Sequence, residues 1–386
     1  MPGYEIIGSE ELDEIKDIFH NGAVLYRNGF ENKRKNCFKV KEFENQFAKF
    51  FSSDHSLAVT SGTAAIRVAL AALGIGENDE VITQSFTFVA TLEAIIESKA
   101  TPVCTEINET LNMDPEDLER KITSKTKAVI VVHMLGTPAQ LRDIKDICDK
   151  HNLFLIEDTA WGCGGSLDGR KLGTWGDIGT FSFDFAKTMT TGEGGMLLFK
   201  NKNIKEKAAA WHDHGHENNP NFPRWEDTRS SSGFNFRMNE LQGAVGLAQL
   251  RKLDFIVKKQ RENMSFFWNQ INMIEGVKLR LSPKGSYETC DALIFSLPSK
   301  EIASKCKNEL SKAGLSTKIL PEAYTWHFVG SFIHMKELEN RSESELNKSF
   351  PKSKEILDKT ISIPIQVNMD KNNAGLLKNA IEESFK

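Results

Sequence analysis

Hydrophobic residues between positions 56 and 200 occur in short apolar runs separated by amphipathic stretches. Runs such as KAVIVVHM (127–134) and LFLIED (153–158) are apolar at consecutive positions, which predicts strands buried on both faces. The stretch AQLRDIKDICDKHN (139–152) lies between them and has apolar residues at helical spacing. Strands alternating with helices predict a parallel sheet covered by helices, and ligands of such sheets bind beyond the carboxyl ends of the strands.

The pattern changes towards both ends of the chain. Residues 40–51 (VKEFENQFAKFF) have helical apolar spacing, and the polar, proline-containing stretch 216–233 predicts an exposed loop. After about residue 250 the chain is richer in lysine and poorer in glycine. We therefore predict an α/β protein with a large domain over residues 1–250, amino-terminal segment included, and a smaller carboxyl-terminal α/β domain over residues 251–386.

Charge and cysteine usage narrow the classes of function. The chain has 49 Lys and Arg against 53 Asp and Glu, a net charge of −4, which argues against non-specific binding of nucleic acid. No apolar run approaches the ~20 residues of a membrane span, and the acidic start MPGYEIIGSEELDEI predicts neither a signal nor a transit peptide. The six cysteines form no CxxC pair, which is typical of reduced thiols. We expect a cytoplasmic protein.

Two candidate ligand groups follow the first predicted strands. In TSGTAA the backbone N–H groups of Gly62, Thr63 and Ala64 open a helix, where they and the helix dipole can hold a phosphate. The alternative is a helix capped by Ser61 without any ligand. Phe88 follows another strand and either packs in the core or stacks on a flat cofactor ring.

Two charged residues follow later strands. Asp158 ends an apolar run and either caps a helix, forms a structural salt bridge, or holds the protonated nitrogen of a heterocycle. Lys187 follows the apolar run GTFSFD, where an unpaired ammonium is costly to bury. It could form a salt bridge, or its amine could be bonded as an imine. Ser182 adds a hydroxyl that could donate to a phosphate.

The order and spacing of these residues resemble the fold-type I pyridoxal-phosphate aminotransferases, and in detail the DegT/DnrJ/EryC1/StrS sugar aminotransferase family. The resemblance covers roughly residues 30 to 255. It is carried by the stretches SGTAAI, NDEVITQSFTFVATLEAI, KAVIVVHMLG, IEDTAWGCGGSLDGRKLGTWGDIGTFSF, KTMTTGEGGMLL and GFNFRMNELQGAVGLAQLRKLD.

The resemblance implies a role for each matching position. Lys187 corresponds to the Schiff-base lysine, Asp158 to the acid that pairs with the pyridine nitrogen, and Phe88 to the aromatic residue stacked on the ring. The expected phosphate contacts are Gly62, Thr63, Ala64 and Ser182. Asn235 corresponds to a residue that reaches the phosphate of a neighbouring subunit, which implies a homodimer with shared sites.

Two positions depart from the family pattern. Trp161 stands where a Gln or His usually contacts the cofactor, and an indole offers only an N–H donor. Asp184 stands where a His or Tyr is frequent. Some members of the family replace the lysine with histidine and become dehydrases, so the presence of Lys187 favours transamination.

The implied reaction moves an amino group from glutamate or glutamine to a keto- or aldehydo-sugar. Short stretches (MPGYEIIG, DHGH and WHF) resemble a subgroup that aminates the C8 aldehyde of an oxidised 3-deoxy-octulosonate for lipopolysaccharide. A nucleotide-linked keto-hexose is the alternative acceptor. Two alternatives to an aminotransferase are a non-catalytic regulatory protein with the same fold and a sugar dehydratase.

Candidate substrate residues are polar or aromatic and lie in loops. A sugar carboxylate or a diphosphate needs cations, which the segment LYRNGFENKRKNCF offers. The histidines of HDHGHENN would share a face only in a strand, and their neighbours predict a loop, so we expect no metal there. The candidates are Arg27, Lys33, Arg34, Lys35, His214, His216, Trp326 and His327. His214 and His216 could instead form a subunit contact, and Trp326 and His327 could instead pack within the smaller domain.

Overall fold

The computed structural model describes residues 2–219, 221–321, 324–338 and 343–386. A seven-stranded sheet forms its centre, in the order β1-β9-β8-β5-β4-β2-β3. Every strand runs parallel to the others except β9, which is antiparallel to both of its neighbours. The strands are β1 (His55–Val59), β2 (Glu80–Gln84), β3 (Thr101–Thr105), β4 (Thr126–Val132), β5 (Phe154–Asp158), β8 (Ile178–Ser182) and β9 (Gly195–Phe199).

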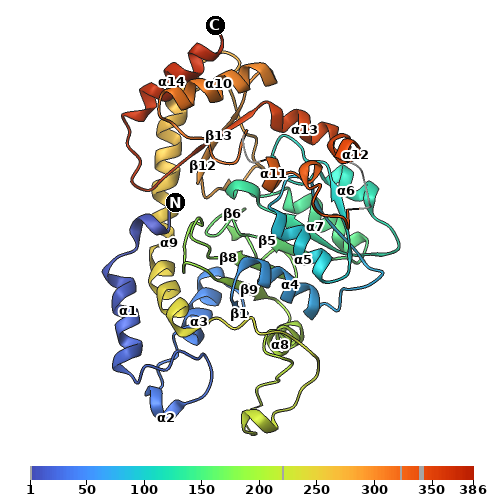
Figure 1. The fold of residues 1–386 in the computed structure, drawn as a ribbon, viewed down its shortest axis with the longest axis vertical. Coiled ribbons are helices and arrows are strands. Elements are labelled where there is room, and N and C mark those ends of the chain that lie inside the picture. Colours follow the sequence, from blue (N-terminus) through green and yellow to red (C-terminus); the bar gives the residue numbers. More distant parts are fainter. Residues whose placement is uncertain (1, 220, 322–323, 339–342) are drawn as a thin grey trace.

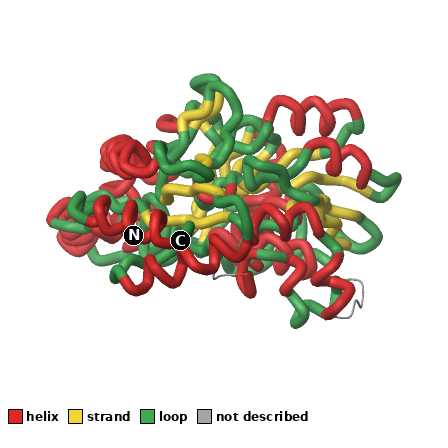
Figure 2. The backbone as a smooth tube through the Cα atoms, turned by 90° about the horizontal axis from the view of Figure 1, so that it is seen from above, coloured by secondary structure: helices red, strands yellow, loops and turns green. Residues whose placement is uncertain are grey.

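Helices cover both faces of this sheet, as the apolar runs predict (Figure 2). One face packs against α4 (Gly62–Ala72), α5 (Val89–Glu97) and α8 (Lys202–Trp211). The other face packs against α3 (Lys39–Phe51), α6 (Pro115–Lys121), α7 (Leu141–Lys150) and the first half of α9 (Glu240–Ile271). The α/β fold with a mostly parallel sheet is confirmed, and the carboxyl ends of β1, β2, β5 and β8 meet at one edge.

Helix α9 joins the large sheet to the rest of the chain (Figure 1). Its 32 residues begin at a capping box of Asn239 and Gln242, and they pass through residue 250 without interruption. The end of α9 packs against a small antiparallel sheet of β10 (Lys278–Leu279), β12 (Ala292–Ser296) and β13 (Thr360–Pro364), covered by α10 (Lys300–Lys312) and α14 (Asn373–Ser384). The division of the chain at residue 250 stays a prediction.

The remaining elements are short. A third sheet contains β11 (Ser286–Tyr287), β6 (Ser166–Leu167) and β7 (Arg170–Lys171). The helices outside the two main sheets are α1 (Ser9–His20), α2 (Glu31–Arg34), α11 (Tyr324–His327), α12 (Glu343–Lys348) and α13 (Pro351–Asp358). Within the described ranges, no helix is both long enough and apolar enough to cross a bilayer.

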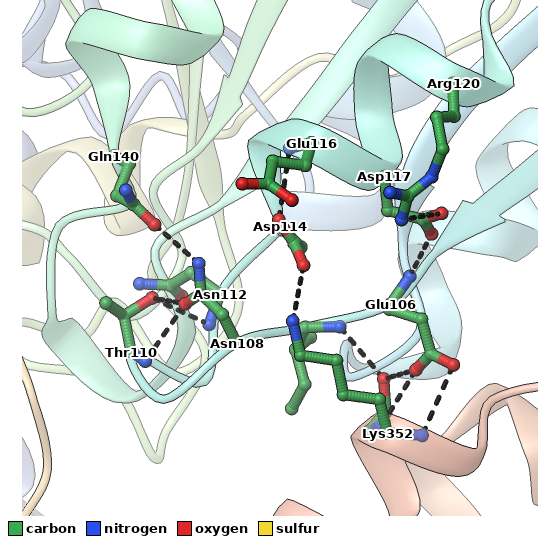
Figure 3. A network of polar contacts seen from close by, with 12 residues as sticks. Glu106, Asn108, Thr110, Asn112, Asp114, Glu116, Asp117, Arg120, Gln140 and Lys352 are labelled. Carbon is green, nitrogen blue, oxygen red and sulfur yellow. Dashed lines mark hydrogen bonds and ion pairs between the residues drawn. The ribbon is translucent and has the colours of Figure 1, made fainter.

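Helix α13 is tied to the end of strands β2 and β3 by a partly buried polar network (Figure 3). The Ser353 hydroxyl lies 2.9 Å from the Ser85 hydroxyl, and the Ile107 amide donates to it at 2.9 Å. The Glu106 carboxylate accepts from the Ser353 amide and hydroxyl. Lys352 donates to Asp114 at 2.7 Å. This network holds the carboxyl-terminal part of the chain against the sheet edge where ligands are expected.

Candidate active site

A cavity of about 470 Å³ opens at the carboxyl ends of β1, β2, β5 and β8. Residues at or after the ends of five strands, β4 included, line it, together with a segment from the carboxyl-terminal part of the chain. Besides Gly62, the polar and aromatic lining residues are Ser61, Thr63, Thr87, Phe88, Thr91, Asp158, Trp161, Thr180, Phe181, Ser182, Asp184, Lys187, Glu193, Lys318 and His327. Sequence-predicted residues from separate strands therefore share one cavity.

Lys187 lies in a turn directly after β8. Its amide donates to the carbonyl of Asp184 at 3.0 Å, and its carbonyl accepts from the Gly3 amide at 3.3 Å. The side chain is 9% exposed, and its Nζ lies 3.6 Å from the centre of the Trp161 ring. Burial lowers the pKa of Lys187 to about 8, although Asp158 and Asp184 attract the ammonium. A buried amine with a lowered pKa is suited to proton transfer near neutral pH.

Asp158 ends β5, the strand next to β8 in the sheet. One carboxylate oxygen accepts from the Thr91 hydroxyl at 3.0 Å, and the other accepts from the Ala160 amide at 3.2 Å. The Thr87 hydroxyl lies 2.9 Å from that of Thr91 and extends this chain of hydroxyls. Burial raises the pKa of Asp158. The carboxylate is held in one orientation inside the cavity, where a cationic ligand group would stabilise its charge.

The start of α4 packs tightly against the end of β8. A Cβ added at Gly62 would lie 2.7 Å from the Cβ of Ser182, so only glycine allows this approach. Ser61 caps the helix by accepting from the Ala64 amide at 3.1 Å. The amide of Ala64 is therefore engaged, contrary to the expectation of three free N–H groups. Gly62, Thr63 and the Ser182 side chain line the cavity at this end.

Three aromatic side chains meet at the mouth of the cavity. The rings of Phe88 and Trp326 are nearly parallel, with an interplanar angle of 14° and centres 6.3 Å apart. The His327 ring lies 5.3 Å from that of Phe88, and the carbonyl of His327 accepts from the Thr87 amide. Phe88 and His327 line the cavity, whereas Trp326 is mostly exposed.

The predicted cations near the amino terminus do not line the cavity. Arg27 donates to Glu44 at 2.8 Å and to the Ala58 carbonyl at 3.0 Å. Arg34 is fully buried and pairs with Glu240 at 3.0 Å. Carboxylates of the chain already pair with both arginines, and their predicted role in holding a substrate anion stays a prediction. Lys33 and Lys35 are exposed and also lie outside the cavity.

The histidines of the 212–216 segment are separated as well. His214 is exposed, whereas His216 is buried and lies 3.1 Å from Asp227. His212 is buried beside Arg27, and burial lowers its pKa to about 3. None of the three lines the cavity of its own chain, and the role of His214 and His216 at a substrate site or a subunit contact stays a prediction. Asn235 is exposed, also away from this cavity.

Sequence reasoning missed several residues of the cavity, among them Thr91 and Lys318. Thr91 lies in the first turn of α5, and Thr87 lies just before the helix, close enough for their hydroxyls to contact. Lys318 follows α10 and reaches the cavity only through the packing of the carboxyl-terminal part of the chain. No local pattern marks Lys318.

The cavity residues fit pyridoxal phosphate. Lys187 offers a buried amine for the aldehyde, and Asp158 offers a fixed carboxylate for the ring nitrogen. Because Gly62 has no side chain, only backbone lies between the start of α4 and Ser182, and the backbone N–H groups of a helix start are suited to a phosphate. Phe88 supplies an aromatic face.

Fold and cavity together define the class: the protein is a pyridoxal-phosphate-dependent sugar aminotransferase. The chain matches the DegT/DnrJ/EryC1/StrS aminotransferase family over residues 23–381 and belongs to that family. It is 39% identical over 273 residues to the GDP-perosamine synthase of Vibrio cholerae, covering 70% of this chain and 71% of that protein. It is 30% identical over 396 residues to the spore coat polysaccharide biosynthesis protein SpsC of Bacillus subtilis, covering 99% and 96%.

Solved structures show the same architecture over nearly the whole chain. An aminotransferase from Psychrobacter cryohalolentis superimposes with a TM-score of 0.85 at 27% identity, covering 98% of this chain and 97% of that one. The 3-amino-5-hydroxybenzoic acid synthase structure superimposes with a TM-score of 0.84 at 25% identity, covering 100% and 98%. The expected fold class, cofactor and aminotransferase activity are confirmed.

Proposed function

We propose that Lys187 and Asp158 are the catalytic pair of this aminotransferase. The observation that carries the proposal is their position at the ends of adjacent parallel strands, inside one cavity with the Gly62 turn and Ser182. Asp158 would hold the ring nitrogen of the cofactor through its carboxylate. The phosphate would be held by Ser182 and by the amino-terminal end of α4, which includes Gly62 and Thr63.

When bound, pyridoxal phosphate supplies an electron-accepting ring that stabilises the charge left when an amino acid loses its Cα proton. Lys187 is placed to take that proton at Nζ and to return it, since its lowered pKa leaves part of the amine neutral near pH 7. Trp161 packs against the amine and limits its range of positions. The donor we propose is glutamate or glutamine.

For the acceptor we propose a sugar carbonyl, with two candidates. The C8 aldehyde of an oxidised 3-deoxy-octulosonate, used for lipopolysaccharide, is supported by the stretches MPGYEIIG, DHGH and WHF. A nucleotide-linked keto-hexose is supported by the similarity to two GDP-perosamine synthases and to a dTDP-4-dehydro-2,3,6-trideoxy-D-glucose 4-aminotransferase, which is 31% identical over 322 residues.

The test begins with the cofactor and continues with the sugar. The purified protein loaded with pyridoxal phosphate should absorb at ~410–430 nm. Reduction with borohydride should convert the lysine imine to a stable covalent adduct, which Lys187→Ala should abolish. Enzyme that has reacted with glutamate is then offered oxidised octulosonate or nucleotide-linked keto-hexoses, and return of the original absorbance identifies the acceptor. An adduct that persists in Lys187→Ala would contradict the assignment of the lysine.

We also propose a cytoplasmic homodimer with shared sites. Asn235 supports the shared site, because it is exposed and lies outside the cavity of its own chain. The exposed aromatic residues of the loop between α8 and α9 support a subunit contact there: Phe222, Trp225 and Phe234.

A further inference from the structure

Lys318 is a second amine in the cavity, and the proposed catalytic pair does not use it. Among the described residues that line the cavity, only Lys187 and Lys318 are lysines and none is an arginine. The Nζ of Lys318 lies 4.9 Å from the centre of the Trp161 ring, which also contacts the Nζ of Lys187. The two amines therefore approach the same indole from separate parts of the chain.

The Lys318 ammonium is held in place by Asp291. Its Nζ donates to the Asp291 carboxylate at 2.6 Å and to the Asp291 carbonyl at 3.2 Å. Asp291 is almost fully buried, and the Lys318 backbone amide donates to the Ser362 carbonyl at 2.8 Å. An ammonium has three N–H groups, so one remains for a ligand. Because the group is already fixed, binding through it costs little side-chain entropy.

We propose that Lys318 binds the α-carboxylate of the amino donor and is a specificity-determining residue for α-amino acids. The inference rests on the proposed function, because it assumes that Lys187 accepts the Cα proton. In an α-amino acid the carboxylate is bonded to the same carbon that loses this proton, so it must lie close to Lys187. Lys318 is the other described lysine that lines the cavity, and its Nζ lies over the same Trp161 ring as the Nζ of Lys187.

The acceptor is a poorer match for this cation. In an octulosonate the carboxylate is at C1, at the opposite end of the molecule from the reacting C8 carbon. A nucleotide-linked sugar has no carboxylate beside its ketone, and its diphosphate needs more cationic groups than one lysine already paired with Asp291.

The experiment measures binding of α-methylglutamate, which has no Cα proton and cannot transaminate, to the cofactor-loaded enzyme by absorbance titration. Lys318→Met should weaken binding about 10- to 100-fold, the range for a lost charge-assisted hydrogen bond. Asp291→Asn removes the same ion pair but leaves the ammonium, and it should bind at least as tightly as the natural enzyme. A purely structural role for the pair predicts that both substitutions weaken binding alike.

A second readout separates the carboxylate from the rest of the donor. We expect Lys318→Met to reduce the preference for glutamate over 4-aminobutanoate, which lacks the α-carboxylate, by at least tenfold in kcat/KM. If Lys318→Met lowered kcat/KM equally for glutamate and 4-aminobutanoate, the assignment of Lys318 would be overturned. Equal losses of α-methylglutamate affinity in Lys318→Met and Asp291→Asn would overturn it as well. Neither result would affect the proposed function. A natural enzyme whose spectrum does not respond to glutamate or glutamine would overturn the proposed function itself.

Discussion

At the scale of single residues, the environment of Lys187 disfavours its charged form. Burial of the amine is the main cause, and the attraction of Asp158 and Asp184 offsets only part of it; repulsion by Lys318 adds a smaller contribution. The pKa of Lys187 falls from 10.5 to about 8, so between these values the unfolded chain binds more protons than the folded one. Stability of the cofactor-free protein therefore rises with pH across this interval, and the cost of the lysine is fully present below pH 8.

We predict that Lys187→Met stabilises the cofactor-free protein at pH 7, because it removes this cost. The gain is at most about 3 kcal/mol, from a pKa shift of 10.5 − 8 = 2.5, and should shrink as the pH rises from 8 towards 10.5. Urea unfolding of both proteins at pH 7, 8.5 and 10 measures it. Lys318→Met serves as the control and should destabilise at pH 7, because it leaves Asp291 buried without its partner.

Residue-scale prediction from the sequence succeeded where a residue follows an apolar strand. Lys187, Asp158 and Phe88 were placed at the ligand edge from local pattern alone, and the structure brings them into one cavity. Arg27 lies outside the cavity of its own chain, and the sequence does not show that it pairs with a carboxylate such as Glu44; its predicted role toward a substrate stays a prediction.

At the scale of elements, the contact between the start of α4 and the end of β8 shapes the phosphate end of the cavity. We predict that Gly62→Ala lowers the affinity for pyridoxal phosphate at least tenfold, since a new Cβ would displace Ser182 or the helix start. Fluorescence titration of the cofactor-free protein measures this affinity.

Gly375 provides the matched control in α14, where an added Cβ meets nothing within 4 Å. Gly375→Ala should leave cofactor affinity unchanged and be neutral or slightly stabilising. Equal cofactor affinity in Gly62→Ala and the natural protein would show that the close approach to Ser182 does not shape the phosphate site.

Element positions were largely predictable because the periods of strands and helices are local. The apolar runs 127–134 and 153–158 became β4 and β5, and the amphipathic stretch between them became α7. The antiparallel direction of β9 and the route of Lys318 into the cavity depend on long-range packing, for which the sequence has no short-range signal.

At the scale of the whole molecule, the proposed shared site can be tested by mixing subunits. Lys187→Ala and Asn235→Ala should each reduce activity strongly when alone. In a mixed dimer, one site combines an intact lysine with an intact asparagine from the other subunit. Random mixing of equal amounts should therefore restore about a quarter of the natural activity. A monomeric mass by light scattering, or no recovery after mixing, would contradict the shared site.

The continuous helix α9 and the Ser353 network fix the two sheets to one another at two separate places. A hinge opening between them would have to break buried hydrogen bonds, so the frame of the cavity should stay closed during turnover. We then expect the motions that accompany substrate entry to be rotations of exposed side chains such as Phe88 and Trp326. Such rotations take nanoseconds or less, whereas domain motions take microseconds to milliseconds. Arrival of the sugar should thus be limited by diffusion and not by rearrangement of the enzyme.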